Sequence, residues 1–120
     1  MVCMKIIEKV LIVEGRQDCL QLKPILNEPV EIVCTNGTVS PHRLDELLQP
    51  YESCDFYAFF DADDMGEKLR KLVQQEYPNT HHLYTLPRYG GVERTPRYHL
   101  AKVLQGAKFK IKSGYLLDKG

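Results

Sequence analysis

The sequence predicts a single α/β domain with a central, mostly parallel sheet of about four strands and helices on both of its faces. Short runs rich in β-branched and aromatic residues alternate along the chain with segments whose apolar residues recur at helical spacing. The connections between successive strand candidates are too long for hairpins, which favours crossover units and parallel pairing. The length of 120 residues is that of one ordinary domain, which we place at 1–120.

Four strand candidates are spaced along the chain, at residues 9–13, 30–34, 56–60 and 82–86. Segment 56–60 is apolar throughout, as expected for a strand that is covered on both faces. A further segment at 108–112 alternates Lys with Phe or Ile, and it is predicted as a short, charged edge strand near the C-terminus.

Four helices are predicted to connect or follow these strands, at 18–26, 41–48, 65–77 and 96–104. Pro24 lies inside the first of them, so this helix is expected to be kinked or to start late. Ser40 with Pro41, and Thr95 with Pro96, each provide a cap followed by a first-turn proline. Pro78 ends the third helix.

The composition is that of a soluble globular protein, with 43% hydrophobic and 27% charged residues. No apolar run approaches the roughly 20 residues that span a bilayer, and the start of the chain lacks the apolar core of a secretion signal. We therefore expect a cytoplasmic protein that makes no membrane contact. Reduced thiols and no zinc ribbon are expected, because no Cys-x-x-Cys pair occurs among the cysteines Cys3, Cys19, Cys34 and Cys54.

The net charge is zero, but the charges are distributed unevenly. Residues 1–67 have 13 acidic and 5 basic residues, a balance of −8, whereas residues 68–120 have 3 acidic and 11 basic residues, a balance of +8. Such a chain can hold metal ions beside a phosphate backbone. Interleaving of the two halves in the fold would remove the asymmetry, so both interpretations stay open at this point.

Acidic residues follow two of the predicted strands. Glu14 comes directly after 9–13, and Asp61 comes directly after 56–60, with Asp63 and Asp64 close behind. If the two strands are neighbours, these side chains face one another at the carboxyl edge of the sheet, where ligands bind in this class of fold. Carboxylates at contact distance oppose ionisation unless a cation compensates them. Mg²⁺ prefers such oxygen ligands, and the lack of clustered His or Cys argues against zinc.

Each of these motifs also has an ordinary structural interpretation. Glu14-Gly15 occurs at many strand-to-turn junctions. The acids at 61–64 directly precede a helix, where they complement its dipole without any chemistry. Thr35-Asn36-Gly37 is typical of a tight turn.

The three motifs in their order resemble the TOPRIM domain, the fold shared by topoisomerases, bacterial primases and certain nucleases. The matching stretches are 11–18 (LIVEGRQD), 35–38 (TNGT) and 59–68 (FFDADDMGEK), within a resemblance that spans about residues 8–104 and leaves 105–120 as an extension. Residues 63–70, together with Gly90-Gly91-Val92-Glu93, look most similar to the nuclease that matures bacterial 5S ribosomal RNA and to its small stand-alone relatives.

The resemblance implies roles for individual residues. Glu14 matches the family's general acid/base, Asp61 and Asp63 match its Mg²⁺-binding D-x-D motif, and Mn²⁺ is a substitute for Mg²⁺. Asp18 and Asp64 are auxiliary ligand candidates, and Gly37 matches the glycine of the middle motif. The candidates for contacts to phosphate or nucleic acid are Gly15, Arg16, Gly37, Lys68, Arg70, Arg88 and Arg94.

Two functions agree with these residues. The first is Mg²⁺-dependent phosphodiester chemistry on RNA or DNA, with Glu14 moving the proton. The second is a non-catalytic TOPRIM module that binds metal and nucleic acid, or a partner protein. The maturation nuclease has a further domain after its TOPRIM core, and this chain ends before one is expected to form, so a protein partner that supplies substrate binding is a further expectation.

Overall fold

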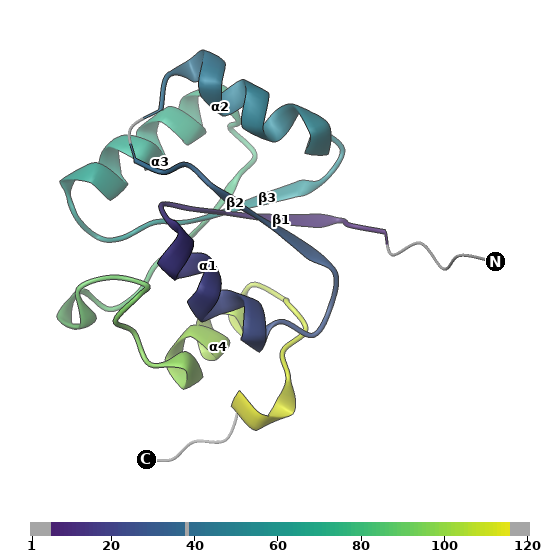
Figure 1. The fold of residues 1–120 in the computed structure, drawn as a ribbon, viewed down its shortest axis with the longest axis vertical. Helices are drawn as coiled ribbons and strands as arrows, with labels where there is room; N and C mark the ends of the chain where they lie inside the picture. Colours follow the sequence, from purple (N-terminus) through teal and green to yellow (C-terminus); the bar gives the residue numbers. More distant parts are fainter. Residues whose placement is uncertain (1–5, 38, 116–120) are drawn as a thin grey trace.

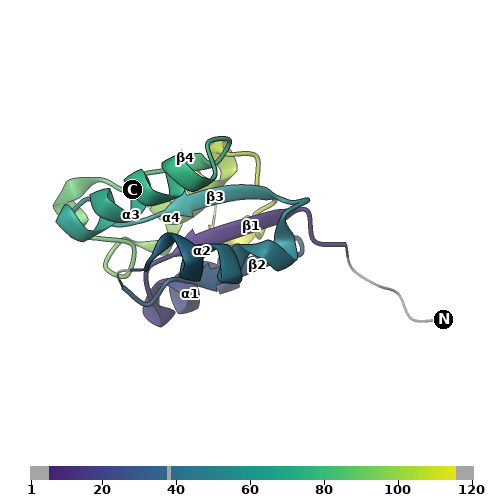
Figure 2. The same ribbon diagram turned by 90° about the horizontal axis from the view of Figure 1, so that it is seen from above.

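A computed structural model describes residues 6–37 and 39–115 of the chain. Four parallel strands form one sheet in the order β2-β1-β3-β4. Figure 2 shows this order from above. The strands are β1 (Lys9–Val13), β2 (Val30–Cys34), β3 (Asp55–Phe59) and β4 (His81–Leu83), and the α-helices are α1 (Arg16–Leu22), α2 (Pro41–Leu48), α3 (Asp64–Glu76) and α4 (Arg97–Gly106).

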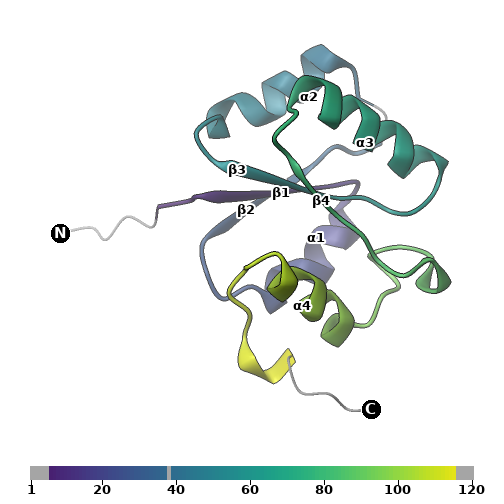
Figure 3. The ribbon, with the colours of Figure 1, turned by 180° about the vertical axis from the view of Figure 1, so that it is seen from behind.

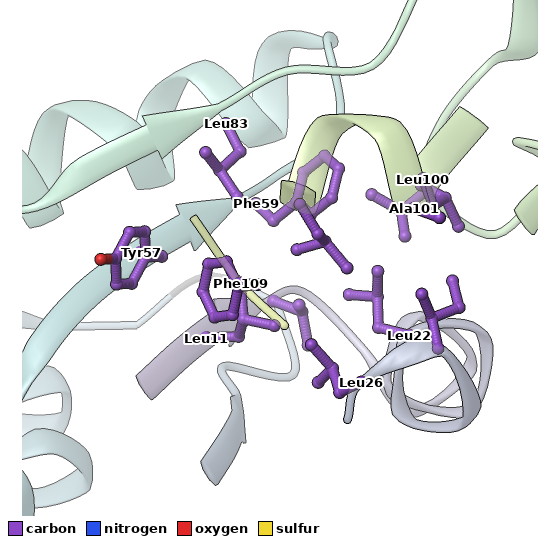
Figure 4. Close-up of a cluster of buried hydrophobic side chains, with 13 residues drawn as sticks. Leu11, Leu22, Leu26, Tyr57, Phe59, Leu83, Leu100, Ala101 and Phe109 are labelled. Atoms are coloured by element: carbon purple, nitrogen blue, oxygen red, sulfur yellow. The ribbon is translucent and has the colours of Figure 1, made fainter. Parts of the chain in front are cut away.

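The helices form a layer on each side of the sheet. Helices α2 and α3 cover one face, and α1 and α4 cover the other (Figures 1 and 3). The strands are apolar on both faces because alternate residues enter different cores. Leu11 packs with Phe59 and Leu100 under α1 and α4 (Figure 4), whereas Ile12 packs with residues such as Leu44 under α2 and α3.

The topology brings the ends of β1 and β3 to one edge of the sheet. The two strands are direct neighbours, with Ile12 opposite Ala58 in the register. Because both run in the same direction, the segments that follow them leave the sheet side by side. The loops after β1, β3 and β4 accordingly lie on the same side of the molecule, at the left of Figure 1.

Most predicted elements are present, with shifted ends. Helix α1 starts at Arg16, and the expected irregularity at Pro24 is a 3-10 turn over Lys23–Ile25. Helix α3 starts at Asp64, because the Asp63 side chain accepts a hydrogen bond from the Gly66 N–H and caps it. Strand β4 ends at Leu83, three residues before the predicted end at 86.

The prediction of an edge strand at 108–112 is wrong. This segment follows α4 directly and stays in the α1/α4 layer, where Ile111 makes an isolated antiparallel bridge with Leu26. Its alternating pattern arises because the buried Phe109 packs edge-on against Tyr57, with ring centroids 4.6 Å apart. Within the described residues, no helix is long and apolar enough to cross a bilayer.

Candidate metal centre

Three carboxylates from two strand ends lie together at the carboxyl edge of the sheet. Glu14 follows β1, and Asp61 and Asp63 lie between β3 and α3. One oxygen of each carboxylate lies within 4.8 Å of the others. Glu14 and Asp61 are half-buried, and Asp63 is exposed. We call these three residues the acidic cluster.

Backbone contacts fix the acidic cluster from the β3–α3 side. The Asp61 N–H donates a hydrogen bond to Glu14 Oε1 at 3.2 Å, which ties the two strand ends together. Gly66 in the first turn of α3 packs directly on Asp61, so that a Cβ added there would overlap the Asp61 carbonyl group and lie 3.1 Å from Glu14 Oε1. A side chain at position 66 is therefore incompatible with this arrangement.

The loop after β4 holds Asp61 from the other side. The Val92 N–H donates to Asp61 Oδ1 at 2.9 Å. Gly91 has φ +134, and a Cβ added to it would lie 2.8 Å from Asp61 Oδ1. Thr95, which is buried, donates from Oγ1 to the Gly91 carbonyl at 2.6 Å, and Gln21 of α1 donates to the Thr95 carbonyl at 2.9 Å. This loop therefore restricts the orientation of the Asp61 carboxylate.

The electrostatics of the acidic cluster favour a bound cation. Burial, together with the negative charges of Asp61, Asp63 and Asp18, raises the pKa of Glu14 to about 7, against the lowering effect of the hydrogen bond from the Asp61 N–H. A divalent ion among these oxygens would remove the repulsion and favour the ionised form. The donor set contains oxygen only, which suits Mg²⁺ or Mn²⁺ better than zinc.

The two auxiliary ligand candidates lie outside the acidic cluster. Asp18 is only 6% exposed, and its Oδ2 accepts a hydrogen bond from the Gly15 N–H at 3.1 Å. Burial raises the pKa of Asp18 to about 6. Its observed role is to close the turn that follows Glu14. Asp64 is exposed at the start of α3, near the cluster in sequence but not one of its three members.

The Thr35-Asn36-Gly37 motif forms a turn that contacts the backbone of Glu14. The Asn36 N–H donates to the Glu14 carbonyl at 2.7 Å, and Asn36 has a left-handed φ of 57. Gly37 also has a positive φ, of 101, which favours glycine there. The motif therefore supports the first strand end. Apart from the neighbours of Gly37 in the chain, no atom of the described residues lies within 4 Å of a Cβ placed at Gly37.

Arg70 does not lie on the surface where a phosphate contact was expected. Its side chain is buried, with 4% of the residue exposed, and Nη2 donates to the carbonyls of Phe60 and Leu83 at 2.7 and 2.8 Å. The guanidinium also lies 4.0 Å from the centroid of the Tyr84 ring. Arg70 thus connects the ends of β3 and β4 directly behind Asp61, and burial lowers its pKa. Its expected role as a phosphate contact is corrected to a structural one.

The other cation candidates are exposed around the acidic cluster. Arg16 starts α1 after Gly15, Lys68 lies in α3, and Arg88 and Arg94 lie in the loop after β4. This loop and the acidic cluster share a cavity of about 120 Å³, whose lining includes Asp61, Asp63, Gly90 and Gly91.

Sequence reasoning assigned no role in the site to Gly66, Gly91 or Thr95. The prediction that Thr95 caps the last helix is wrong, because Pro96 occupies the N-cap position of α4 and the Thr95 hydroxyl donates to the Gly91 carbonyl instead. The two glycines lie inside stretches that carried the family resemblance, D-A-D-D-M-G and G-G-V-E. Their contacts with Asp61 explain why glycine stands at both places. No sequence signal links Thr95 to Asp61, because that connection runs through a loop carbonyl.

Comparisons with known proteins agree with this fold. The structure of a small TOPRIM domain protein from Bacillus stearothermophilus superposes with a TM-score of 0.89 and is 45% identical in sequence, covering 97% of this chain and 99% of that one. The uncharacterized protein YusF of Bacillus subtilis is 42% identical over 113 residues, which are 94% of this chain and 77% of YusF. No family model matches the sequence. The chain belongs to the family of small TOPRIM domain proteins.

Ribonuclease M5 sequences are more distant relatives. The protein from Lactiplantibacillus plantarum is 33% identical over 90 residues, and that from Bacillus subtilis is 29% identical over 84 residues. These matches cover 74% and 69% of this chain, but only 46% and 44% of the two ribonucleases. The chain therefore spans less than half of the length of these two ribonucleases.

Proposed function

We propose that this protein cleaves phosphodiester bonds of nucleic acid with the help of Mg²⁺ held at the acidic cluster. The observation that carries the proposal is the convergence of Glu14, Asp61 and Asp63 within 4.8 Å, from strand ends 47 residues apart in the chain. The relatives named ribonuclease M5 support RNA as the first substrate to test.

Different residues of the acidic cluster would bind the ion and transfer the proton. Asp61 and Asp63 would hold the ion, and the contacts of Asp61 with Val92 and Gly91 keep its carboxylate oriented. Glu14, which a bound ion would keep ionised, is placed to take a proton from water and, once protonated, to return one to the leaving hydroxyl. When bound, Mg²⁺ supplies a Lewis acid that stabilises charge on the phosphate and on the leaving oxygen.

Exposed cations around the acidic cluster would bind the flanking phosphates. Arg16, Lys68, Arg88 and Arg94 come from three different segments at this edge of the sheet. Contacts of this kind are electrostatic and make binding strongly dependent on salt. A cytoplasmic location fits an RNA substrate and is part of the proposal.

A cleavage assay on RNA and DNA oligonucleotides, with and without Mg²⁺, tests the proposal. Glu14→Gln is expected to lower the rate by about 10²-fold or more, because it removes the group that moves the proton. The matched control is Glu52→Gln, an exposed glutamate that follows α2 at the opposite edge of the sheet, which should leave the rate unchanged. Cleavage that persists in EDTA, or a fully active Glu14→Gln variant, contradicts the proposal. Salt-sensitive binding without cleavage would instead indicate the non-catalytic module.

A further inference from the structure

A group of aromatic and basic side chains lies beside the acidic cluster. It consists of Arg88, Tyr89, Tyr98 and His99, from the loop after β4 and the first turn of α4. We call these four residues the aromatic cluster. None of them belongs to the hydrophobic core, and the proposed function uses only Arg88, as one of its phosphate contacts.

Contacts within the aromatic cluster centre on Tyr89. Arg88 Nη2 donates to the Tyr89 hydroxyl at 3.2 Å, and its guanidinium lies 5.1 Å from the centroid of the same ring. The His99 ring centroid lies 5.5 Å from that of Tyr89. The Tyr89 hydroxyl is also hydrogen-bonded to Tyr98, and these bonds lower its pKa. The ring is therefore held in place at the surface, which reduces the entropy lost on binding a ligand.

The aromatic cluster stays accessible in spite of these contacts. Tyr98 is 40% exposed, Arg88 is exposed, and Tyr89 and His99 are half-buried. An aromatic ring that is held by an arginine and partly exposed to solvent resembles the platforms on which nucleic-acid bases stack.

The loop after β4 connects the aromatic cluster to the acidic cluster. Gly91, two residues after Tyr89, lies against the Asp61 carboxylate. Two residues span at most about 7 Å, so the backbone of Tyr89 lies close to that of Gly91. Pro87 and Gly90, on either side of the segment 88–89, line the same cavity as Asp61 and Asp63. A base on Tyr89 would thus belong to a nucleotide near the phosphate at the acidic cluster.

The charge of the same segment fits a phosphate backbone. Residues 84–99 contain three arginines and one acidic residue, Glu93, a balance of +2. Arg94 lies beside Gly90, where a Cβ would be 3.8 Å from its Cδ, and Arg97 Nε donates to Gln21. The segment therefore combines ring faces with positive charge, the pairing typical of surfaces that bind single strands.

We propose that the aromatic cluster binds an unpaired base, so that single-stranded nucleic acid, or a single-stranded segment within a folded one, is the substrate class of this protein. In a duplex both faces of each base are already stacked, which leaves none for Tyr89. The proposal rests on the proposed function for the position of the phosphate, and it adds the form of the substrate.

The lack of tryptophan in the sequence allows a direct test. Tyr89→Trp introduces a single tryptophan at the aromatic cluster, and Tyr51→Trp introduces one before β3, at the opposite edge of the sheet. Both variants are titrated in EDTA, so that no cleavage occurs, with a ten-nucleotide oligo-uridine, an oligo-thymidine of equal length and a blunt duplex. Binding is followed in parallel by the anisotropy of the labelled oligonucleotides.

We expect either single strand to quench the tryptophan fluorescence of Tyr89→Trp, with saturation at high concentration and less quenching as the salt concentration rises. The tryptophan fluorescence of Tyr51→Trp should stay unchanged. Tyr89→Ala should weaken single-strand binding by about 5- to 150-fold, the range typical of one stacked base. Its near-ultraviolet circular dichroism and melting temperature show whether the variant is folded. If Tyr89→Ala does not fold, the fluorescence quenching of Tyr89→Trp is by itself the test of the proposal.

Three results would overturn the proposal: single strands that bind without quenching, a duplex that quenches equally, or no binding of either single strand. The outcome for the proposed function is read separately. Quenching without cleavage in Mg²⁺ keeps the stacking site and removes the nuclease activity. Cleavage that depends on Glu14 but occurs without quenching keeps the nuclease activity and removes the stacking site.

Discussion

Glu14 couples the stability of the metal-free protein to pH. Burial raises its pKa from 4.5 to about 7, so between these values the folded state binds more protons at this group than the unfolded state does. The contribution of Glu14 to stability must then fall as pH rises from about 4.5 to 7. Asp18, with a pKa raised from 3.8 to about 6, acts in the same direction over a lower window.

The first prediction follows from this coupling. Because Glu14 is partly exposed and screened by solvent, we expect its share of the loss to be only about 1–2 kcal/mol. Urea unfolding in EDTA at pH 5 and at pH 7.5 measures the free energy of unfolding at each pH, and the difference between them gives the loss. Glu14→Gln should reduce the difference between the two pH values by that amount, and added Mg²⁺ should offset the loss in the wild type, because the ion binds the ionised form. An equal pH dependence in both proteins would show that Glu14 titrates normally.

Gly91 provides a second prediction at the scale of one residue. An added Cβ would lie 2.8 Å from Asp61 Oδ1, and φ +134 is strained for any side chain. Gly91→Ala should therefore displace Asp61 or the loop, lower stability by about 1–3 kcal/mol, and weaken Mn²⁺ binding measured by calorimetry.

The matched control for Gly91→Ala is Gly106→Ala. Gly106 ends α4 with open space around it and without a positive φ, so an alanine there should leave Mn²⁺ affinity unchanged and stability equal or slightly higher. Wild-type Mn²⁺ affinity in Gly91→Ala would mean that the loop does not orient Asp61.

At the scale of elements, Arg70 joins the ends of two strands to α3. Its guanidinium donates to the carbonyls of Phe60 on the β3 side and Leu83 at the end of β4. Arg70→Met should leave both carbonyls without this partner and lower the free energy of unfolding by about 2–4 kcal/mol. The exposed neighbour Lys71 provides the control, since Lys71→Met should change stability by less than about 0.5 kcal/mol. Chemical denaturation compares the two, and a neutral Arg70→Met would contradict the structural role.

The sequence predicts strands better than it predicts the role of one arginine. The apolar run at 56–60 identifies a buried strand without any knowledge of its neighbours, because apolar side chains on both faces of a strand must be buried. Arg70 follows the buried Leu69 in α3, but an arginine there gives no sign of burial, because its partners are the carbonyls of Phe60 and Leu83 in other segments of the chain. Segment 108–112 was misread for a similar reason, because its alternation reflects Phe109 against Tyr57 and not sheet pairing.

At the scale of the whole molecule, the acidic residues were predictable and the way they are held was not. The rule that ligands gather at the carboxyl ends of parallel strands needs only the order of strands and acids, which is local information. The contacts of Gly91 and Val92 with Asp61 join positions 30 or 31 residues apart, and only the folded chain shows them. The position of Cys3 lies outside the described residues, and the other three cysteines are free thiols.

The most direct test of the account is to locate a divalent ion in the folded protein. Crystals soaked in Mn²⁺ should show an anomalous difference peak bounded by carboxylate oxygens of Glu14, Asp61 and Asp63, and the peak should vanish in the Asp61→Asn/Asp63→Asn double variant. No peak among these three side chains at saturating Mn²⁺, or an equal peak in the double variant, would contradict it.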